Sequence, residues 1–425
     1  MNHSRWLFLE PYVHLIHRGG TLLLYNTVSK KVLEFPDAGE LIPLADELLV
    51  PENGYVTQLT PIQLEKREII EFIEQLRQHF FGDLLDPEWS EGRPVNIFPE
   101  PAVKHGFSSV PEEGSPLKPG LNLRNYLQEI TLYLNSETAS SAPGVTSAFR
   151  QFSYPVCITQ REEEMDLNLF RALIDDVNQY TPTLIHISGW NLLSYSGLED
   201  VISKLVSSPF QKKYHLLAEH WEKRIIPFIL IQKRSSVALY ITFPTEPDTI
   251  LGYLHSLPDE KMLKKLEFNF VVSSQEELEM ALEIIPLVEL ENLFLKPIYT
   301  GRNIDFFKEN VFVSKEEIMA AQPNQQQLLS RISMNENDFG KLFILPGGET
   351  FANLNDPTIG HATEKSLTEL VAQEINHGTS WRRTRSKVNP CSSCLYQFLC
   401  PPISSYEVLM NRYNFCDVYP TKGAV

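Results

Sequence analysis

Four of the chain's five cysteines lie in its last thirty-five residues and follow the pattern C-x2-C-x5-C-x15-C. A Cys-x2-Cys pair places two thiolates close enough to share one metal centre, and two later cysteines complete a four-sulfur shell. Such a shell suits either tetrahedral zinc or an iron–sulfur cluster. The sequence therefore predicts one metal centre, bound by Cys391, Cys394, Cys400 and Cys416.

Two other interpretations of these cysteines stay open. Four unrelated thiols, or two disulfides, would also account for the residues. The start of the chain lacks a charged stretch followed by an apolar core and a cleavage site, so we expect a cytoplasmic protein with reduced thiols. The fifth cysteine, Cys157, stands alone and cannot hold a cluster.

Composition narrows the classes of partner. The chain has 425 residues, a net charge of −17 and a pI near 5.2. This acidic balance argues against non-specific binding to nucleic acid, which depends on neutralising phosphates, and against an anionic membrane surface. No run of apolar residues is long enough to predict a membrane-spanning helix.

Proline marks the main boundary along the chain. Six prolines lie between residues 91 and 120, mixed with glycine and serine: Pro94, Pro99, Pro101, Pro111, Pro116 and Pro119. Such a stretch builds no regular element and is typical of a semi-extended connector. We therefore expect a small module at 1–90, a linker at 91–120 and the bulk of the chain beyond it, with few contacts across this boundary.

The N-terminal module predicts three strands followed by three helices. Strand-like runs lie at 12–16, 21–26 and 31–35, with turn residues between them. In the clearest helical stretch, apolar residues recur at helical spacing: Ile69, Phe72, Ile73, Leu76 and Phe80.

The stretches YVHLIHRGGTLLLYNTVSKKVLEF and FIEQLRQHFFGDLLD carry this pattern, and the first 85 residues resemble a RiPP recognition element. Members of that family are winged-helix-like modules that hold the leader peptides of ribosomally made, modified peptides. The resemblance implies that a leader peptide adds as a strand beside the third strand and packs on the third helix. The peptide-binding residues would be Lys31, Val32, Leu33, Glu34 and Phe35 on the strand and Ile69, Phe72, Ile73 and Leu76 on the helix. A small structural domain without a ligand is the alternative.

Between residues 122 and 334, short apolar runs alternate with helical patterns. Strand-like runs lie at 130–135, 184–188, 238–243, 266–272 and 293–298. Ser274 and Ser314, each followed three residues later by glutamate, are expected to open helices as capping boxes. This alternation indicates βα units on a parallel sheet, open or closed into part of a barrel.

The stretch LIHISGWNLLSYSGLEDVISKL, which begins at Leu184, resembles the second strand of radical SAM enzymes. The positions that match the family's S-adenosylmethionine motif are Ser188, Gly189, Trp190 and Asn191. Trp replaces a glycine that permits close approach of a ligand, and Asn cannot balance an ammonium. The loop at 136–144 matches the family's C-x3-C-x2-C loop and contains no cysteine. We therefore expect no bound S-adenosylmethionine and no radical SAM reaction by this chain alone.

The C-terminal stretch from LFILPGGETFANL to PCSSCLYQFLCPPISSYEVLMNRYNFC resembles a SPASM domain, the two-cluster extension of radical SAM peptide maturases. The positions for the first cluster fall near Leu342, at 352–353 and near Ser404, and none is cysteine. The four cysteines match the second cluster. The resemblance implies one iron–sulfur cluster, of 4Fe–4S type, with zinc as the alternative.

Together these features predict an α/β fold: a partial (βα) barrel of radical SAM type at 121–335, between the winged-helix-like βββααα module and a SPASM-like four-cysteine domain at 336–425. The resemblances imply a catalytically degenerate partner protein that binds a precursor peptide, a cysteine-complete radical SAM maturase, or both. Two alternatives remain. One is an electron carrier or enzyme whose cluster takes part in redox chemistry, and the other is a zinc-stabilised structural protein.

Overall fold

A computed structural model describes residues 3–86, 88–89, 92–99, 126–138, 147–180, 182–288 and 292–418. The predicted linker therefore lies outside the described residues, apart from 92–99. The same holds for 139–144 of the loop that was compared with the radical SAM cysteine loop.

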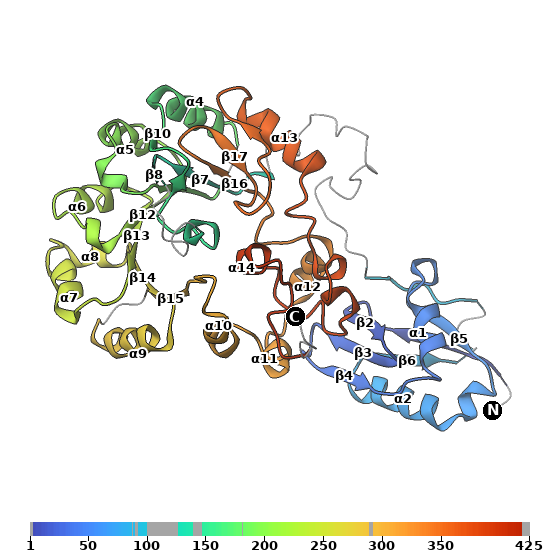
Figure 1. Ribbon diagram of the computed structural model, residues 1–425. Helices are drawn as coiled ribbons and strands as arrows, with labels where there is room; N and C mark the ends of the chain where they lie inside the picture. The colour runs from blue at the N-terminus through green and yellow to red at the C-terminus, as the bar shows by residue number, and fades with distance from the viewer. Residues whose placement is uncertain are drawn as a thin grey trace.

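The largest element is a sheet whose nine described strands run in the order β15-β14-β13-β12-β11-β7-β16-β17-β18. Adjacent strands from β15 to β16 are parallel, whereas β17 and β18 add antiparallel at one edge. The strands lie along an arc (Figure 1). Their bounds are β7 (Glu129–Tyr133), β11 (Leu184–Ser188), β12 (Gln211–Leu217), β13 (Ser235–Ile241), β14 (Leu266–Val272), β15 (Leu293–Pro297), β16 (Lys341–Ile344), β17 (Glu349–Phe351) and β18 (Gly360–His361). The predicted mixed α/β fold with a mostly parallel sheet is confirmed.

Helices cover the outer side of this arc (Figure 1). They are α4 (Leu167–Val177), α5 (Leu198–Val206), α6 (Ile225–Leu230), α7 (Pro247–His255), α8 (Glu260–Leu263), α9 (Gln275–Ile284) and α13 (Leu367–His377). Side chains alternate along each strand, so on β11 Ile185 and Ile187 join the apolar core beneath the helices. His186 and Ser188 consequently face the inner side of the arc.

Local sequence signals set several helix starts. The Asp166 carboxylate accepts hydrogen bonds from the N–H groups of Asn168 and Leu169 and so begins α4. The predicted capping box at Ser314 is present at the start of α11 (Lys315–Ala320). At Ser274 only half of the predicted box forms, because the Glu277 carboxylate accepts from the backbone N–H of Ser273 instead.

The N-terminal module contains two small antiparallel sheets. The first is β2 (Val13–Arg18), β3 (Thr21–Asn26) and β4 (Val32–Phe35), which confirms the three predicted strands. The second is β5-β1-β6, formed by β1 (Arg5–Leu9), β5 (Val56–Leu59) and β6 (Gly82–Leu85), and it was not predicted. The expectation of three helices is wrong, since the described α-helices of this module are α1 (Ile42–Leu48) and α2 (Arg67–Gln78). Phe80 lies beyond α2 and is exposed.

The sheet β2-β3-β4 packs on both faces. Leu22 and Leu24 of β3 point to the module's own core, which includes α2. Leu23 and Tyr25 point the other way, into a second apolar cluster that contains Cys394 and Cys400. The Tyr25 hydroxyl also donates to the carbonyl of Pro323 at 2.7 Å.

The expectation of few contacts between the module and the rest of the chain is therefore wrong. The cysteine-bearing segment and the helices α10 (Ile304–Asn310), α11, α12 (Gln325–Ser333) and α14 (Ser405–Leu409) lie between the module and the arc (Figure 1). A third small sheet, formed by β8 (Asn135–Thr138), β9 (Ile158–Thr159) and β10 (Glu163–Glu164), lies beside β7. Because β16 pairs with β7, the large sheet continues into the segment predicted as the C-terminal domain.

Candidate metal, cofactor and peptide sites

The four C-terminal cysteines line one small cavity, together with Arg385, Tyr396 and Phe415 among others. Cys391, Cys394 and Cys400 are buried, and Cys416 is partly exposed. The backbone holds Cys416 in place, because residues 415 and 417 hydrogen-bond to Val313 on both sides of it.

Several groups near the thiols suit a thiolate-bound centre. The backbone N–H of Tyr396 donates to the sulfur of Cys394 at 3.4 Å, and the Arg385 guanidinium lies 3.7 Å from the sulfur of Cys391. Burial raises the pKa of Cys394 to about 11 and that of Cys400 to about 12. A bound cation offsets such a shift, because a coordinating thiol loses its proton. By its chemistry, a set of four thiols suits an iron–sulfur cluster or zinc. As placed, however, no three Cys, His, Asp or Glu side chains of the described residues are grouped closely enough to hold a single ion, so the four thiols would have to draw together to bind zinc.

The four residues compared with the radical SAM cofactor motif lie together at the end of β11 and just beyond it, against Asn135. Ser188 is fully buried. A Cβ on Gly189 would lie 2.2 Å from the Asn135 side-chain oxygen, so only glycine fits there. The backbone N–H of Trp190 donates to the Asn135 carbonyl at 3.0 Å, and the Asn135 amide donates to the Asn191 carbonyl at 2.7 Å. The side chain of Asn135 thus fills the space beside the glycine.

The carboxyl ends of the parallel strands carry an apolar cluster on their inner side. Residues 148–158 supply Phe149, Tyr154 and Cys157, which pack against Tyr133 at the end of β7 and against side chains of β12, β13 and β14. Trp190 packs on the same cluster. Cys157 is completely buried there, apart from the other four cysteines.

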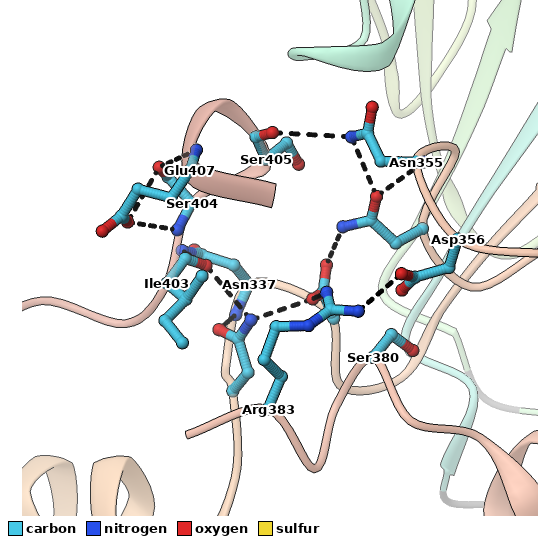
Figure 2. A network of polar contacts seen from close by, with 12 residues as sticks. Asn337, Asn355, Asp356, Ser380, Arg383, Ile403, Ser404, Ser405 and Glu407 are labelled. Atoms are coloured by element: carbon cyan, nitrogen blue, oxygen red, sulfur yellow. Dashed lines mark hydrogen bonds and ion pairs between the residues drawn. The ribbon is translucent and has the colours of Figure 1, made fainter. Parts of the chain in front are cut away.

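The positions compared with the first SPASM cluster have structural roles. Leu342 lies in the sheet core, and the Ser404 side chain caps α14. Asn353 donates to the Asp338 carboxylate at 2.8 Å. Figure 2 shows the polar network around Ser404, in which Arg383 also pairs with Asp356. Burial raises the pKa of Asp338 to about 6, against the lowering effect of Asn353 and Arg383.

The two halves of the predicted peptide site differ in accessibility. On α2, Ile69, Phe72, Ile73 and Leu76 are all buried in the module's core. On β4, Val32, Leu33 and Phe35 are half-buried and Glu34 is exposed. The Lys31 ammonium lies 3.2 Å from a ring nitrogen of His79. The Phe35 ring contacts the Phe72 ring edge-on, with 5.2 Å between the ring centres. Because Ile73 is buried in the same core, Ile73→Glu would disrupt the core before it tested peptide binding.

A polar site on the inner face of the arc was missed by the sequence analysis. Ring nitrogens of His186 and His215 lie 2.8 Å apart, and the other His215 ring nitrogen lies 3.0 Å from the Tyr240 hydroxyl. His186 is also 3.6 Å from the Glu129 carboxylate, which Lys341 approaches to 3.3 Å. The two histidines are far apart in the chain and come together because β11 and β12 are adjacent strands. Polar residues at alternate positions of β11 and β12 were the available signal.

Charge and burial shift several pKa values in this site. The hydrogen-bonding contact with His186 is the largest cause that lowers the pKa of Glu129, to about 2. Burial lowers the pKa of His215 well below its usual range, and the charges of His186, Lys213 and Lys296 lower it further. The site therefore combines an ionised carboxylate with a neutral, buried imidazole.

No family model matches the chain, and no curated protein matches it. Among solved structures, Streptococcus suis SuiB bound to precursor peptide SuiA is 11% identical over 93% of this chain and 94% of its own, with a TM-score of 0.45. Streptococcus suis SuiB alone is 12% identical over 97% of this chain and 100% of its own, with a TM-score of 0.46. Native anSMEcpe with bound AdoMet and Cp18Cys peptide is 12% identical over 64% of this chain and 88% of its own, with a TM-score of 0.42. At these identities and scores we draw no conclusion about family or function from the likeness. None of the helices in the described part of the chain has the length and apolar character needed to cross a membrane.

Proposed function

We propose that this chain is a peptide-binding partner protein of a peptide-maturation system, and that it binds one metal centre but does not cleave S-adenosylmethionine itself. In this role it would hold a precursor peptide and present it to a cysteine-complete radical SAM maturase. The observation that carries the proposal is the unpaired backbone edge of β4, a strand whose Glu34 side chain contacts the cysteine-bearing segment.

The hydrogen-bond register shows which backbone groups this edge offers. The N–H of Asn26 donates to the carbonyl of Lys31, so pairing between β3 and β4 recurs at Leu33 and Phe35. The backbone groups of Val32 and Glu34 therefore point away from β3. β4 is the last strand of its sheet among the described residues, so an extended peptide can pair with these two residues.

The edge strand is tied to the metal loop by the Glu34 carboxylate. It accepts a hydrogen bond from the Tyr396 hydroxyl at 2.9 Å and lies 3.3 Å from the Lys315 ammonium. Tyr396 stands between Cys394 and Cys400 in the sequence, and its backbone N–H contacts the Cys394 sulfur. A peptide bound along β4 would thus lie within a few residues of the metal centre.

Cys391, Cys394, Cys400 and Cys416 would hold the metal centre. A bound iron–sulfur cluster would supply one-electron transfer and would stabilise the surrounding loops, since metal-binding energy in such sites is also folding energy. Arg385 would balance part of the thiolate charge, and it is itself fixed by the Glu407 carboxylate at 2.7 Å. Zinc would supply the structural role alone.

Two features support a barrel without S-adenosylmethionine chemistry. The contact between Gly189 and Asn135 fills the place beside the glycine, and the apolar cluster around Phe149 occupies the carboxyl ends of the strands. In open α/β sheets, ligands usually bind at that end of the strands. The inner face there is already packed with the chain's own side chains.

The electron-carrier alternative is favoured by one observation. The ring of Phe415, next to Cys416, lies 6.3 Å from the ring of Phe307, which lies 5.4 Å from the ring of Tyr406. Tyr406 lines a cavity on the inner face of the arc. Aromatic side chains therefore connect the cysteine cavity with the interior of the arc.

Binding by the full chain tests the peptide proposal. The probe is a fluorescently labelled short peptide encoded by a neighbouring reading frame, with a scrambled peptide of the same composition as its control. Val32→Pro removes an outward N–H from the edge and should weaken binding about tenfold or more, because proline cannot donate to an added strand. Gln58→Pro is the matched control, since the N–H of Gln58 points outward from the edge strand β5. Equal loss in both variants, or equal binding of the scrambled peptide, would contradict strand addition at β4.

A further inference from the structure

A cavity of about 420 Å³ lies on the inner face of the arc. One part of its wall is charged and comes from the strands: Glu129, His186, Lys213, His215, Glu267, Lys296 and Lys341. Another part is aromatic: Phe149, Phe152, Tyr240 and Tyr406. This volume and this mixture are typical of sites for small molecules. The cavity is distinct from both the cysteine cavity and the edge of β4.

Most of the charged groups in the wall are already paired. The Glu129 carboxylate lies 3.3 Å from the Lys341 ammonium, and the Glu267 carboxylate lies 2.8 Å from the Lys213 ammonium. The Asn269 amide donates to the second oxygen of Glu267 at 3.1 Å. These pairs leave no carboxylate of the strands without a cation.

Among the charged groups of the strands, Lys296 is the cation that remains, while Arg150 lines the cavity from outside the strands. Its ammonium lies 5.5 Å from the centre of the Phe294 ring, and it has no ion-pair partner within the part of the chain that the structure describes. Burial is the main reason why the pKa of Lys296 is lowered, and Glu267 offsets part of this shift. Although the whole chain has a net charge of −17, the lysines and glutamates that the strands contribute to this wall have a surplus of one positive charge.

The aromatic wall adjoins the strand that carries Lys296. The Tyr406 hydroxyl donates to the carbonyl of Pro297, the residue after Lys296, at 2.7 Å. The ring of Phe152 lies 6.1 Å from the ring of Tyr240 and 6.4 Å from that of Tyr406. These rings and Lys296 line the same cavity.

We propose that this cavity binds a small organic monocarboxylate, with its carboxylate on Lys296 and its apolar part on Phe152 and Tyr406. One surplus positive charge matches one carboxylate, whereas a phosphate dianion would be repelled by Glu129 and Glu267. The histidine pair adds polar surface next to the carboxylate. The inference stands independently of the proposed peptide binding, because it uses neither β4 nor the cysteines.

Titration calorimetry on the full chain at constant ionic strength tests this inference, with benzoate and neutral benzamide as probes of the same shape. Ligands of this size bind with dissociation constants on the order of millimolar. We expect benzoate to bind the unmodified chain about tenfold or more tightly than benzamide, because a charge-assisted hydrogen bond is lost with the amide. Lys296→Met should remove this preference, and Lys296→Arg should keep it.

Lys264→Met is the matched control, since Lys264 is an exposed lysine that does not line the cavity. It should leave both affinities unchanged. Thermal melting of each variant checks that it is folded. Equal binding of benzoate and benzamide, no binding of benzoate up to about 50 mM, or an unchanged preference in folded Lys296→Met would overturn the assignment.

Discussion

Glu374 on α13 should make the chain less stable as the pH rises. Its carboxyl is almost fully buried, and burial is the main cause that raises its pKa to about 7. The Ser380 hydroxyl donates to it at 2.8 Å and Arg382 is nearby, but both only reduce the shift. Because the pKa in the folded state is above the value of 4.5 for the unfolded chain, the stability from the protonated carboxyl is present below about pH 4.5 and is lost as the pH rises through about 7.

The size of the effect follows from the shift. Each pKa unit corresponds to about 1.4 kcal/mol, so Glu374 lowers the stability of the chain, relative to low pH, by about 3 kcal/mol above pH 8 and by about 1 kcal/mol at pH 5. Glu374→Gln keeps the shape of the side chain and removes the ionisation. Its free energy of unfolding relative to the unmodified chain should therefore rise by about 2 to 3 kcal/mol between pH 5 and pH 8.5.

Urea unfolding of both proteins at the two pH values measures this difference. Any effect of the amide on packing is the same at both pH values and cancels in the comparison. A difference in unfolding free energy that does not change between pH 5 and pH 8.5 would refute the reasoning, and so would a change of opposite sign.

Three further predictions concern the metal, the module interface and the glycine after β11. Cys394→Ala should abolish metal binding and loosen the C-terminal segment, whereas Cys157→Ala should keep the metal; iron, zinc and sulfide analysis of anaerobically purified protein distinguishes them, and zinc without sulfide would exclude a cluster. Leu23→Ala should lower the free energy of unfolding by about 2 to 5 kcal/mol, because Leu23 is buried between the module and the cysteine segment; a loss below about 1 kcal/mol in urea unfolding would argue against that interface. Gly189→Ala should cost about 1 to 3 kcal/mol through its clash with Asn135, and unchanged thermal stability would show that the loop adapts.

Strands that are apolar at most positions were predictable from the sequence. β11 and β14 have the predicted bounds, because each is a mostly apolar run that ends at a polar turn. β12 was missed because its sequence, QKKYHLL, begins with three polar residues, two of them lysines. Lys212 is nevertheless buried, since its ammonium donates to the carbonyls of Leu205 and Ser208 near the end of α5. Acceptors on another element cannot be read from the strand itself.

In the candidate sites, too, some features could be predicted from the sequence and others could not. The grouping of the four cysteines at one cavity was predictable from their spacing. The Cys-x2-Cys pair shows why, since Cys391 and Cys394 share one turn. The docking of the module on that segment was not predicted, although the run TLLLYN of β3 is apolar at consecutive positions, which indicates burial on both faces. The contact between His186 and His215 depends on the register of adjacent strands, which the sequence does not specify.

Amide hydrogen exchange of the full chain, with and without the short peptide from the neighbouring reading frame, tests the central claim most directly. If the peptide adds as a strand at the open edge, the amides of Val32 and Glu34 should become protected, because they point outward from β4 and would gain a hydrogen-bond partner. The outward amide of Gln58 on β5 should exchange at the same rate in both samples. Protection absent from β4 at saturating peptide, or found only at other edges, would contradict the account.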